Sequence, residues 1–322
     1  MKFIWPDGIR CAAILSFDLD GEAGIVQANP QNAENLCLLS WARYGTKVGL
    51  PRILDLLRAK QVRASFFVSC HSAQLYPQLV KCISSEGHEI GVHGYLNRDL
   101  SASELEQQEA ALVSTIEMVE KLTGRKVLGY RAPSCSMNLD TPALIARHQL
   151  LYDSSLMDDD RPYILPTAAG NLAEIPLSWT NNDWQHFGTQ VEQSNGCGAI
   201  TKTCQQVLQL WQEEFAGIYH YGGVFVLRLH PEIIGRPAQL LLLEKLIDYM
   251  RMHSGVWFTT GEQIARLVLG QGKVEVKIKS TPHRQIKCPL LTQDLSPEQI
   301  SDYVLKLLQK SNRRKLNSET LE

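Results

Sequence analysis

Two carboxylates, Asp18 and Asp20, are the first residues of this sequence whose types and spacing could do chemistry. They follow the apolar run CAAILSF, residues 11–17, and precede Gly21. In α/β folds, functional sites gather at the carboxyl ends of strands, and a strand that ends in a turn can aim both side chains at one pocket. One carboxylate could hold a metal ion there while the other acts as a base. Taken alone, the Asp-x-Asp pattern is more often a turn with two solvated acids.

Three further titratable residues end apolar segments of the same kind: His93 in GHEIGVHGY (87–95), Arg131 in GYRAPS (129–134) and His230 in LRLHPEIIGRP (227–237). An arginine can hold a carboxylate with its guanidinium fork. Because the carboxyl ends of parallel strands lie on one face of a barrel, we expect these side chains to converge with the two carboxylates. Together they indicate a functional site, although each is a weak signal alone.

The elements that must position these residues can be predicted from apolar runs. Seven short, continuously apolar runs predict parallel strands that are covered on both faces, at residues 11–17, 62–69, 89–93, 127–133, 173–179, 224–230 and 256–260. Helical patterns lie between them, for example at 49–61, where Pro51 is near the start, and at 237–255. This alternation predicts an α/β fold, either a barrel or a doubly wound sheet.

Composition limits the classes of protein that fit. The chain has 322 residues, of which 44% are hydrophobic and 20% charged, and its net charge is −2. No apolar run reaches the ~18 residues of a membrane-spanning helix, and no basic stripe with interleaved aromatics indicates nucleic-acid binding. Eight cysteines are dispersed without a CxxC motif, and the start of the chain has no signal-peptide pattern. We therefore expect a cytoplasmic protein whose partners include neither nucleic acid nor a membrane.

The motifs resemble those of the polysaccharide deacetylase family, also called the NodB-homology or carbohydrate esterase family 4 proteins. The resemblance depends on SFDLDGE (16–22), ASFFV (64–68), GHEIGVHGY (87–95), GYRAPS (129–134), YDSS (152–155) and LHPEIIGRP (229–237). Within this family, the chain is similar to the cytosolic branch of peptidoglycan deacetylase-like proteins, cyclic imide hydrolases and allantoinases. Residues 38–57 resemble an insert that is typical of this branch.

This resemblance implies a distorted, seven-stranded (β/α) barrel over residues 1–270 and the hydrolysis of non-peptide C–N bonds. It implies that Asp18 is the general base, that Arg131 orients this base, and that His230 is the general acid that protonates the leaving nitrogen. Asp20 and His93 would be metal ligands. Amide hydrolysis needs an activated water, a stabiliser for the oxyanion and a proton donor, and the set of residues offers all three.

Asn97 departs from the family pattern, which has a second metal-binding histidine at this position. An amide oxygen is a poorer zinc ligand than imidazole. We therefore expect Asp20, His93 and Asn97 to bind a divalent metal weakly, with zinc the first candidate. A metal-independent enzyme acting on an electrophilic cyclic imide or ureide is the alternative within the same class. A catalytically impaired protein that only binds its ligand is the alternative from a different class, and the retained base, arginine and acid oppose it.

Five residues near these motifs are predicted to contact the substrate: Tyr95, Pro133, Ser134, Asp183 and Trp184. For Trp184, simple packing is an equally good interpretation. The substrate would be a small amide, imide, ureide or N-acetyl sugar. By analogy with the branch, we expect a homo-oligomer, specifically a tetramer.

Residues 271–322 lie outside the resemblance and form a predicted C-terminal extension. Ser296 as N-cap and Pro297 in the first turn predict one amphipathic helix at 297–310. We expect its apolar face to dock against a surface, because isolated helices of this length are marginal in water. A transient helix in a disordered tail is the alternative.

Overall fold

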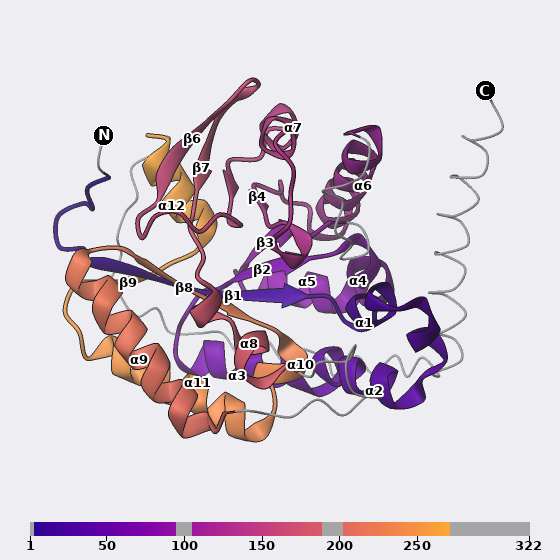
Figure 1. The fold of residues 1–322 in the computed structure, drawn as a ribbon, viewed down its shortest axis with the longest axis horizontal. Coiled ribbons are helices and arrows are strands. Elements are labelled where there is room, and N and C mark those ends of the chain that lie inside the picture. The colour runs from indigo at the N-terminus through magenta and orange to yellow at the C-terminus, as the bar shows by residue number, and fades with distance from the viewer. Residues whose placement is uncertain (1–2, 95–104, 189–201, 271–322) are drawn as a thin grey trace.

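A computed structural model describes residues 3–94, 105–188 and 202–270 of the chain. In these ranges, the strands form one nine-stranded sheet with the order β6-β7-β5-β4-β3-β2-β1-β8, and β9 pairs with β1 (Figure 1). The strands are β1 (Cys11–Leu19), β2 (Ser65–Val68), β3 (Glu89–Val92), β4 (Gly129–Tyr130), β5 (Tyr152–Asp153), β6 (Tyr163–Thr167), β7 (Gly170–Glu174), β8 (Val224–Leu229) and β9 (Val256–Phe258). Every paired neighbour runs parallel except for the β6–β7 hairpin.

Strand β1 is the centre of the sheet, and all nine of its residues are buried. It pairs with β8 along one edge, while β9 and β2 pair with the beginning and the end of its other edge. Its side chains alternate between two apolar clusters. Phe17 and the other odd-numbered residues of β1 pack under the helices, whereas Ala12 and Ile14 face the inside of the curled sheet with Phe67. Burial on both faces explains why this strand reads as a continuous apolar run.

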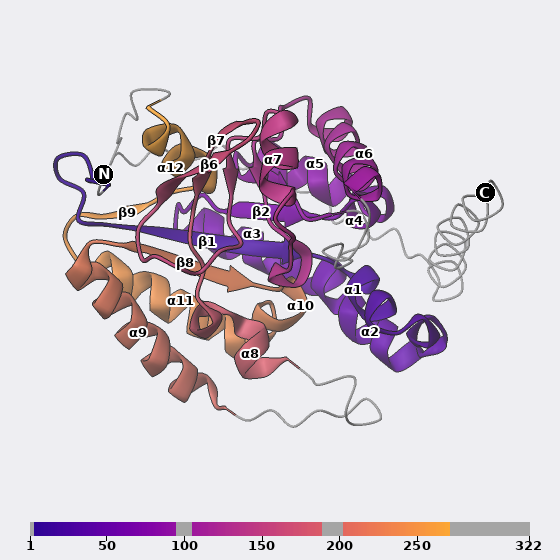
Figure 2. The same ribbon diagram turned by 45° about the horizontal axis from the view of Figure 1, so that its top comes forward.

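The helices of the described residues are α1 (Glu22–Ala28), α2 (Leu36–Tyr44), α3 (Leu50–Ala59), α4 (Cys70–Leu75), α5 (Pro77–Ser85), α6 (Leu105–Thr123), α7 (Thr141–Arg147), α8 (Asp183–Phe187), α9 (Cys204–Tyr221), α10 (Pro231–Ile234), α11 (Pro237–Arg251) and α12 (Gly261–Val268). Most of them cover the outer side of the sheet, whereas α12 packs Ile264 and Ala265 into the inner cluster. Figures 1 and 2 show α9 and α11 side by side along β8, with α4, α5 and α6 together beside β2 and β3. The arrowheads of β1 and β8 point toward the side of the molecule where α1 and α10 lie (Figure 2).

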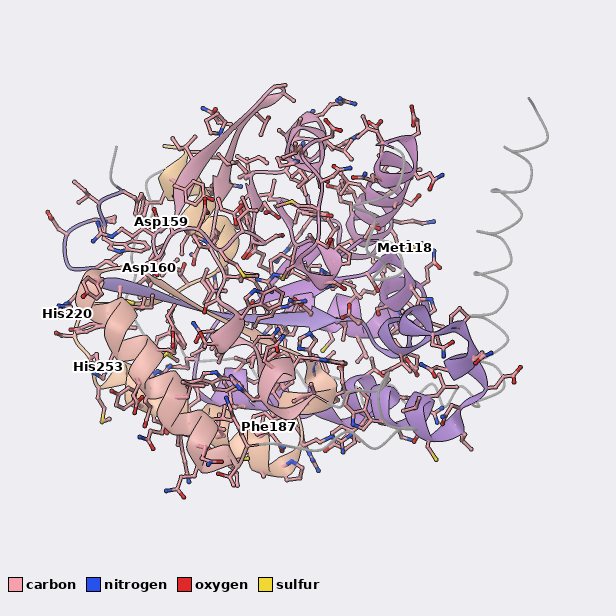
Figure 3. The ribbon with its side chains drawn as sticks, viewed as in Figure 1. Met118, Asp159, Asp160, Phe187, His220 and His253 are labelled. Atoms are coloured by element: carbon pink, nitrogen blue, oxygen red, sulfur yellow. The ribbon has the colours of Figure 1, made fainter. Side chains whose placement is uncertain are left out.

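Aromatic side chains join α9 to α11. His253, which follows α11 and lies close to α9 in Figure 3, packs edge-on against Phe215, Tyr219 and Tyr249, with ring centroids 5.1, 5.1 and 4.9 Å away. Helix α9 itself begins with a capping box at Thr203 and ends at Gly222 in the left-handed region, with φ 72°. These contacts hold the two helices together, and Phe215 also packs against Phe225 of β8, the strand that His230 follows.

A π-helix (η2, Gly45–Gly49) joins α2 to α3 and packs against α10. A Cβ atom at Gly49 would lie 2.1 Å from the carbonyl oxygen of Pro231, and one at Gly45 would lie 2.8 Å from the backbone nitrogen of Glu232. Only glycine allows this approach of two backbones. Because α10 starts directly after His230, the π-helix helps to set the position of this histidine.

The α/β fold and the curled, barrel-like parallel sheet are confirmed, and so are helices close to 49–61 and 237–255. The expected number of strands was seven, whereas the described residues contain nine. The predicted strand 173–179 lies instead at Gly170–Glu174, where it pairs with β6. In the described ranges, no helix is long and apolar enough to cross a membrane. The extension at 271–322 lies outside the described residues, so its helix and the domain boundary stay predictions.

Candidate active site

Asp18 lies at the centre of the site and is fully buried near the end of β1. Its Oδ1 accepts a hydrogen bond from Arg131 Nη1 at 2.9 Å, and its Oδ2 accepts one from Arg228 Nε at 2.5 Å. Burial alone would raise the pKa of this carboxyl. The positive charges of Arg228 and Arg131, with smaller contributions from the two nearby histidines, outweigh burial and hold the pKa well below its usual range. Asp18 is therefore a carboxylate at neutral pH.

Arg131 is also fully buried, and further N–H groups of its guanidinium are hydrogen-bonded to serine residues. Its Nε and Nη2 donate to the carbonyl and hydroxyl oxygens of Ser154, at 3.1 and 3.0 Å, and Nη1 also donates to Ser16 Oγ at 2.9 Å. The guanidinium carbon lies 4.0 Å from the centre of the Phe67 ring. Since its nitrogens bind within the protein, Arg131 can hold Asp18 but offers little to a substrate.

Arg228 is a site residue that the sequence analysis missed. It lies on β8, two residues before His230, and is 7% exposed. Besides binding Asp18, it donates from Nη1 to the sulfur of Cys135 at 2.8 Å. The sequence contained one signal for this role, a cation inside the apolar run VFVLRLH. Charged residues are rarely buried without a partner, so an arginine in a buried strand indicates a charged group beside it.

His93 places its Nε2 between the two carboxylates of the site. Its Nδ1 lies 2.9 Å from the carbonyl oxygen of Arg131, and since a carbonyl can only accept, Nδ1 carries the proton. Its Nε2 lies 3.7 Å from Asp18 Oδ2 and 3.7 Å from Asp20 Oδ1. Both His93 Nε2 and Asp20 Oδ1 are buried, and neither has a hydrogen-bond partner among the described residues.

These two atoms fit a bound cation. Metal-binding histidines commonly donate their second nitrogen to a carbonyl, as His93 does. Two ligands of a tetrahedral zinc ion, each ~2.1 Å from the metal, lie about 3.4 Å apart, close to the distance between His93 Nε2 and Asp20 Oδ1. Burial, together with the charge of Asp18, raises the pKa of Asp20, although the charges of His93, His230 and Arg228 oppose this rise. In the described ranges, no set of three or more histidine, cysteine or acidic ligands occurs.

Asn97, the third predicted metal ligand, and Tyr95, a predicted substrate contact, lie outside the described residues. Of the other predicted contacts, Pro133 is buried against Gly94, where an added Cβ would lie 2.7 Å from its Cγ. Ser134 is exposed and, with Cys135, adopts positive φ values of 55° and 51°. Two consecutive non-glycine residues in this region are unusual and often mark functional loops.

His230 is held by Asp183 at the start of α8. Asp183 Oδ1 lies 2.7 Å from His230 Nδ1, and Asp183 Oδ2 accepts from the His230 backbone N–H at 2.9 Å. Burial would lower the pKa of His230, but the negative charges of Asp183 and Asp18 raise it to about 9. His230 is therefore an imidazolium at neutral pH, and its Nε2 lies 3.8 Å from Asp18 Oδ2.

Asp183 and Trp184 were predicted to contact substrate, and the structure places both beside His230. Asp183 is fully buried, with both oxygens directed at the histidine. The half-buried ring of Trp184 packs edge-on against the His230 ring, with centroids 5.2 Å apart. Glu232, which the sequence analysis also missed, is 3% exposed, and burial together with the charge of Asp20 outweighs the effect of His230 and raises its pKa to about 8.

The five residues predicted to converge thus meet in one buried site, from strands far apart in the sequence. The site combines a carboxylate and an imidazolium, whose facing atoms lie 3.8 Å apart, with a histidine nitrogen and a carboxylate oxygen that are buried and have no hydrogen-bond partner among the described residues. Comparisons with known proteins identify the family of this chain. The family model for polysaccharide deacetylases matches residues 44–152. The crystal structure of a putative polysaccharide deacetylase from Mycobacterium smegmatis is 35% identical, covers 88% of this chain and 98% of its own, and superposes with a TM-score of 0.80. The chain belongs to the polysaccharide deacetylase family.

Two other similar proteins broaden the comparison. A peptidoglycan deacetylase from Helicobacter pylori is 29% identical over 253 residues, which are 70% of this chain and 86% of that protein. The crystal structure of an allantoinase is 27% identical, covers 82% of this chain and 91% of its own, and has a TM-score of 0.70.

Proposed function

We propose that the protein hydrolyses a non-peptide C–N bond in a small substrate. Deacetylation of an amide and ring opening of a cyclic imide or ureide are the two forms of this reaction. The observation that carries the proposal is the pairing of an ionised Asp18 with a protonated His230, whose facing atoms lie 3.8 Å apart. The names of the relatives, a peptidoglycan deacetylase and an allantoinase, support this class of reaction.

In the proposed reaction, Asp18 accepts a proton from the water molecule that attacks the carbonyl carbon. His230 donates its Nε2 proton to the leaving nitrogen, and the C–N bond breaks. Arg131 holds Asp18 in position through Oδ1, and Asp183 holds His230 through Nδ1. Asp18 gains one proton and His230 loses one, so the transfer of a single proton from Asp18 to His230 returns the site to its starting state.

We also propose that Asp20 and His93, with Asn97 as third ligand, hold a divalent metal, zinc being the first candidate. When bound, such an ion would polarise the carbonyl and acidify the attacking water. The support is the pair of buried, unpartnered atoms, Asp20 Oδ1 and His93 Nε2. Replacement of a histidine by Asn97 favours weak binding, and hydrolysis of an electrophilic imide without metal remains the alternative within this proposal.

The second candidate is a protein that binds its ligand without turning it over. Two observations favour it, the asparagine at position 97 and the two arginines that occupy both oxygens of Asp18. A carboxylate with two cationic partners is a weak base, since partners that stabilise the ionised form lower its affinity for a proton.

A hydrolysis screen separates the two candidates. Purified full-length protein would be incubated with cyclic imides, ureides and N-acetyl sugars, with and without added zinc, and products would be followed by chromatography. We expect turnover of at least one class, with a loss on the order of 10²–10⁴ in Asp18→Asn and in His230→Asn. Saturable binding of a substrate with no turnover under any condition would establish the binding-only function instead.

The cytoplasmic location, the small-molecule substrate and the homo-oligomer, specifically a tetramer, belong to the same proposal. They are supported by the dispersed cysteines of the sequence and by the family branch. Light scattering of the full-length protein would give its mass in solution, and a monomer would contradict the expected oligomer.

A further inference from the structure

A cavity lies at the amino ends of the parallel strands, at the opposite end of the sheet from Asp18. It has a volume of about 240 Å³ and is lined by residues at the beginnings of β2, β3 and β4 and of α12. Asp18 and His93, in contrast, lie at the carboxyl ends of β1 and β3. The four residues of β3 alone span roughly 13 Å at ~3.3 Å per residue. The cavity is therefore separate from the candidate active site.

Three cations line this cavity without a counter-ion. Arg63 precedes β2, and Arg125 and Lys126 precede β4. All three are exposed, and their side chains make no hydrogen bond or ion pair within the part of the chain that the structure describes. Cations around one small cavity repel one another, and an anion placed between them would remove this repulsion.

His88 adds a fourth donor from a buried position. It is 5% exposed, and its Nδ1 accepts a hydrogen bond from the backbone N–H of Ala64 at 3.2 Å. The proton of the neutral ring is therefore on Nε2, which has no partner among the described residues, although His88 lines the cavity. Burial, with the charges of Arg63 and Arg58, lowers the pKa of His88 to about 4, so this neutral donor form persists at neutral pH.

The acidic groups of the cavity are already bound within the protein. Glu89 Oε2 accepts from Ser65 Oγ at 2.6 Å, and its Oε1 accepts from Tyr152 Oη at 2.7 Å and from the Glu262 N–H at 3.0 Å. Glu262 Oε1 accepts from Arg266 at 2.9 Å. The hydrogen-bonding capacity that faces the cavity is therefore dominated by donors, and most of these donors are cationic.

We propose that this cavity binds a small oxyanion of the phosphate class, free or carried on a metabolite. The guanidinium groups of Arg63 and Arg125 present donors in the fork geometry that suits phosphate oxygens, and Lys126 supplies a further charge. His88 Nε2 donates from the wall of the cavity. This site is independent of the proposed hydrolysis, because none of its residues contacts Asp18, Asp20 or His230.

Isothermal titration of the full-length protein with inorganic phosphate tests the proposal, at neutral pH and at an ionic strength held constant with sodium chloride. We expect saturable binding with a dissociation constant of about 1 mM or tighter, in the range that a few charge-assisted hydrogen bonds supply. The double variant Arg125→Gln, Lys126→Gln should bind at least about tenfold more weakly. The matched control is Lys245→Gln, which removes an exposed cation from α11 outside the cavity and should leave binding unchanged.

Three results would overturn the proposal: heats that do not saturate beyond those of chloride, the same affinity in the double variant as in the wild type, and acetate binding as tight as that of phosphate. The second would place the phosphate elsewhere in the molecule, including the active site. The third would remove the preference for a dianion. Both substituted side chains are exposed, so an unchanged melting temperature of the double variant should accompany the loss of binding.

Discussion

At the scale of single residues, Asp18 depends on two arginines that reach it from different strands. Removing one partner of a buried ion pair leaves an uncompensated charge and costs ~3–5 kcal/mol. In Arg228→Leu, Arg131 remains on Oδ1, so we expect the free energy of unfolding to fall by about 3 kcal/mol, at the low end of this range. Denaturant unfolding of the two proteins measures the difference.

The control for this experiment is an exposed pair of the same kind. Arg147 lies 3.6 Å from Glu109, and its side chain is 53% exposed. Surface pairs contribute about 0–1 kcal/mol, so Arg147→Leu should change stability little. Equal losses in the two variants would mean that Arg228 is not a buried partner of Asp18.

Asp183 controls the protonation of His230. Its charge is the main force that raises the pKa of His230 from 6.5 to about 9 against the effect of burial. Because the folded-state pKa is raised, the stability from this pair is complete below pH ~6.5 and is lost as pH rises through about 9. In Asp183→Asn, we expect the pKa to fall and the activity that needs protonated His230 to end at a lower pH.

An NMR titration of the imidazole signals measures this pKa without a substrate. The other histidine signals serve as internal references and should titrate as in the wild type. A His230 midpoint that is the same in both proteins would show that Asp183 is not the source of the raised pKa.

Residue types and spacing predicted the convergence of Asp18, Asp20, His93, Arg131 and His230, because each residue ends an apolar run. They did not predict Arg228, which lies within such a run and finds its partner 210 positions away. Periodicity shows that a side chain is buried but not which groups surround it. The roles of Asp183 and Trp184 depend in the same way on the path of a loop that no local pattern describes.

At the scale of elements, the contact between η2 and α10 requires glycine. In Gly49→Ala, the new Cβ would lie 2.1 Å from the carbonyl oxygen of Pro231, so α10 must shift. Overpacking of this kind costs ~1–3 kcal/mol, and we expect the upper part of this range because the clash is with backbone. The shift should also displace His230, which α10 follows directly.

Gly217 is the matched control, since it lies within α9 and an added Cβ would meet nothing within 4 Å. Gly217→Ala should stabilise the protein by about 0.5–1 kcal/mol through helix propensity. Thermal melting of both variants measures these changes in stability. A Gly49→Ala protein as stable as the wild type would show that the backbones of η2 and α10 can separate without cost.

Sequence patterns predicted the long elements better than the short ones. The apolar pattern extends over nine residues in β1 and over several helical turns in α3 and α11, and all three elements lie close to their predicted positions. Strands β4 and β5 have two residues each, and β6 alternates between exposed and half-buried positions. Such strands form because their neighbours pair with them, so their existence depends on tertiary structure rather than on local propensity.

At the scale of the whole molecule, metal binding should raise the stability of the folded protein, and tighter binding should raise it more. A ligand that binds only the folded state stabilises it by about 2.7 kcal/mol at 100 times its dissociation constant. We expect wild-type protein to lose zinc on mild chelation and to show a small rise in melting temperature with zinc. Asn97→His should retain the metal and show a larger rise.

Elemental analysis after chelation, together with melting curves with and without zinc, provides the measurement. His93→Ala in the Asn97→His background is the control, and it should lose the retained metal because Nε2 is one of the two orphaned atoms. Stoichiometric zinc that survives chelation in the wild type would contradict weak binding and would point to a further ligand.

The position of β1 in the sheet has a consequence for synthesis of the chain. This strand precedes every other strand of the described residues, yet it pairs with β8 and β9, which end at Leu229 and Phe258. The edge of β1 that pairs with β8 must therefore wait, unpaired, until most of the chain has been translated, and its contacts with β8 are among the least local in the fold. An exposed apolar strand edge is a site of aggregation. Folding of this protein during translation should consequently be slow and dependent on chaperones that shield the nascent chain.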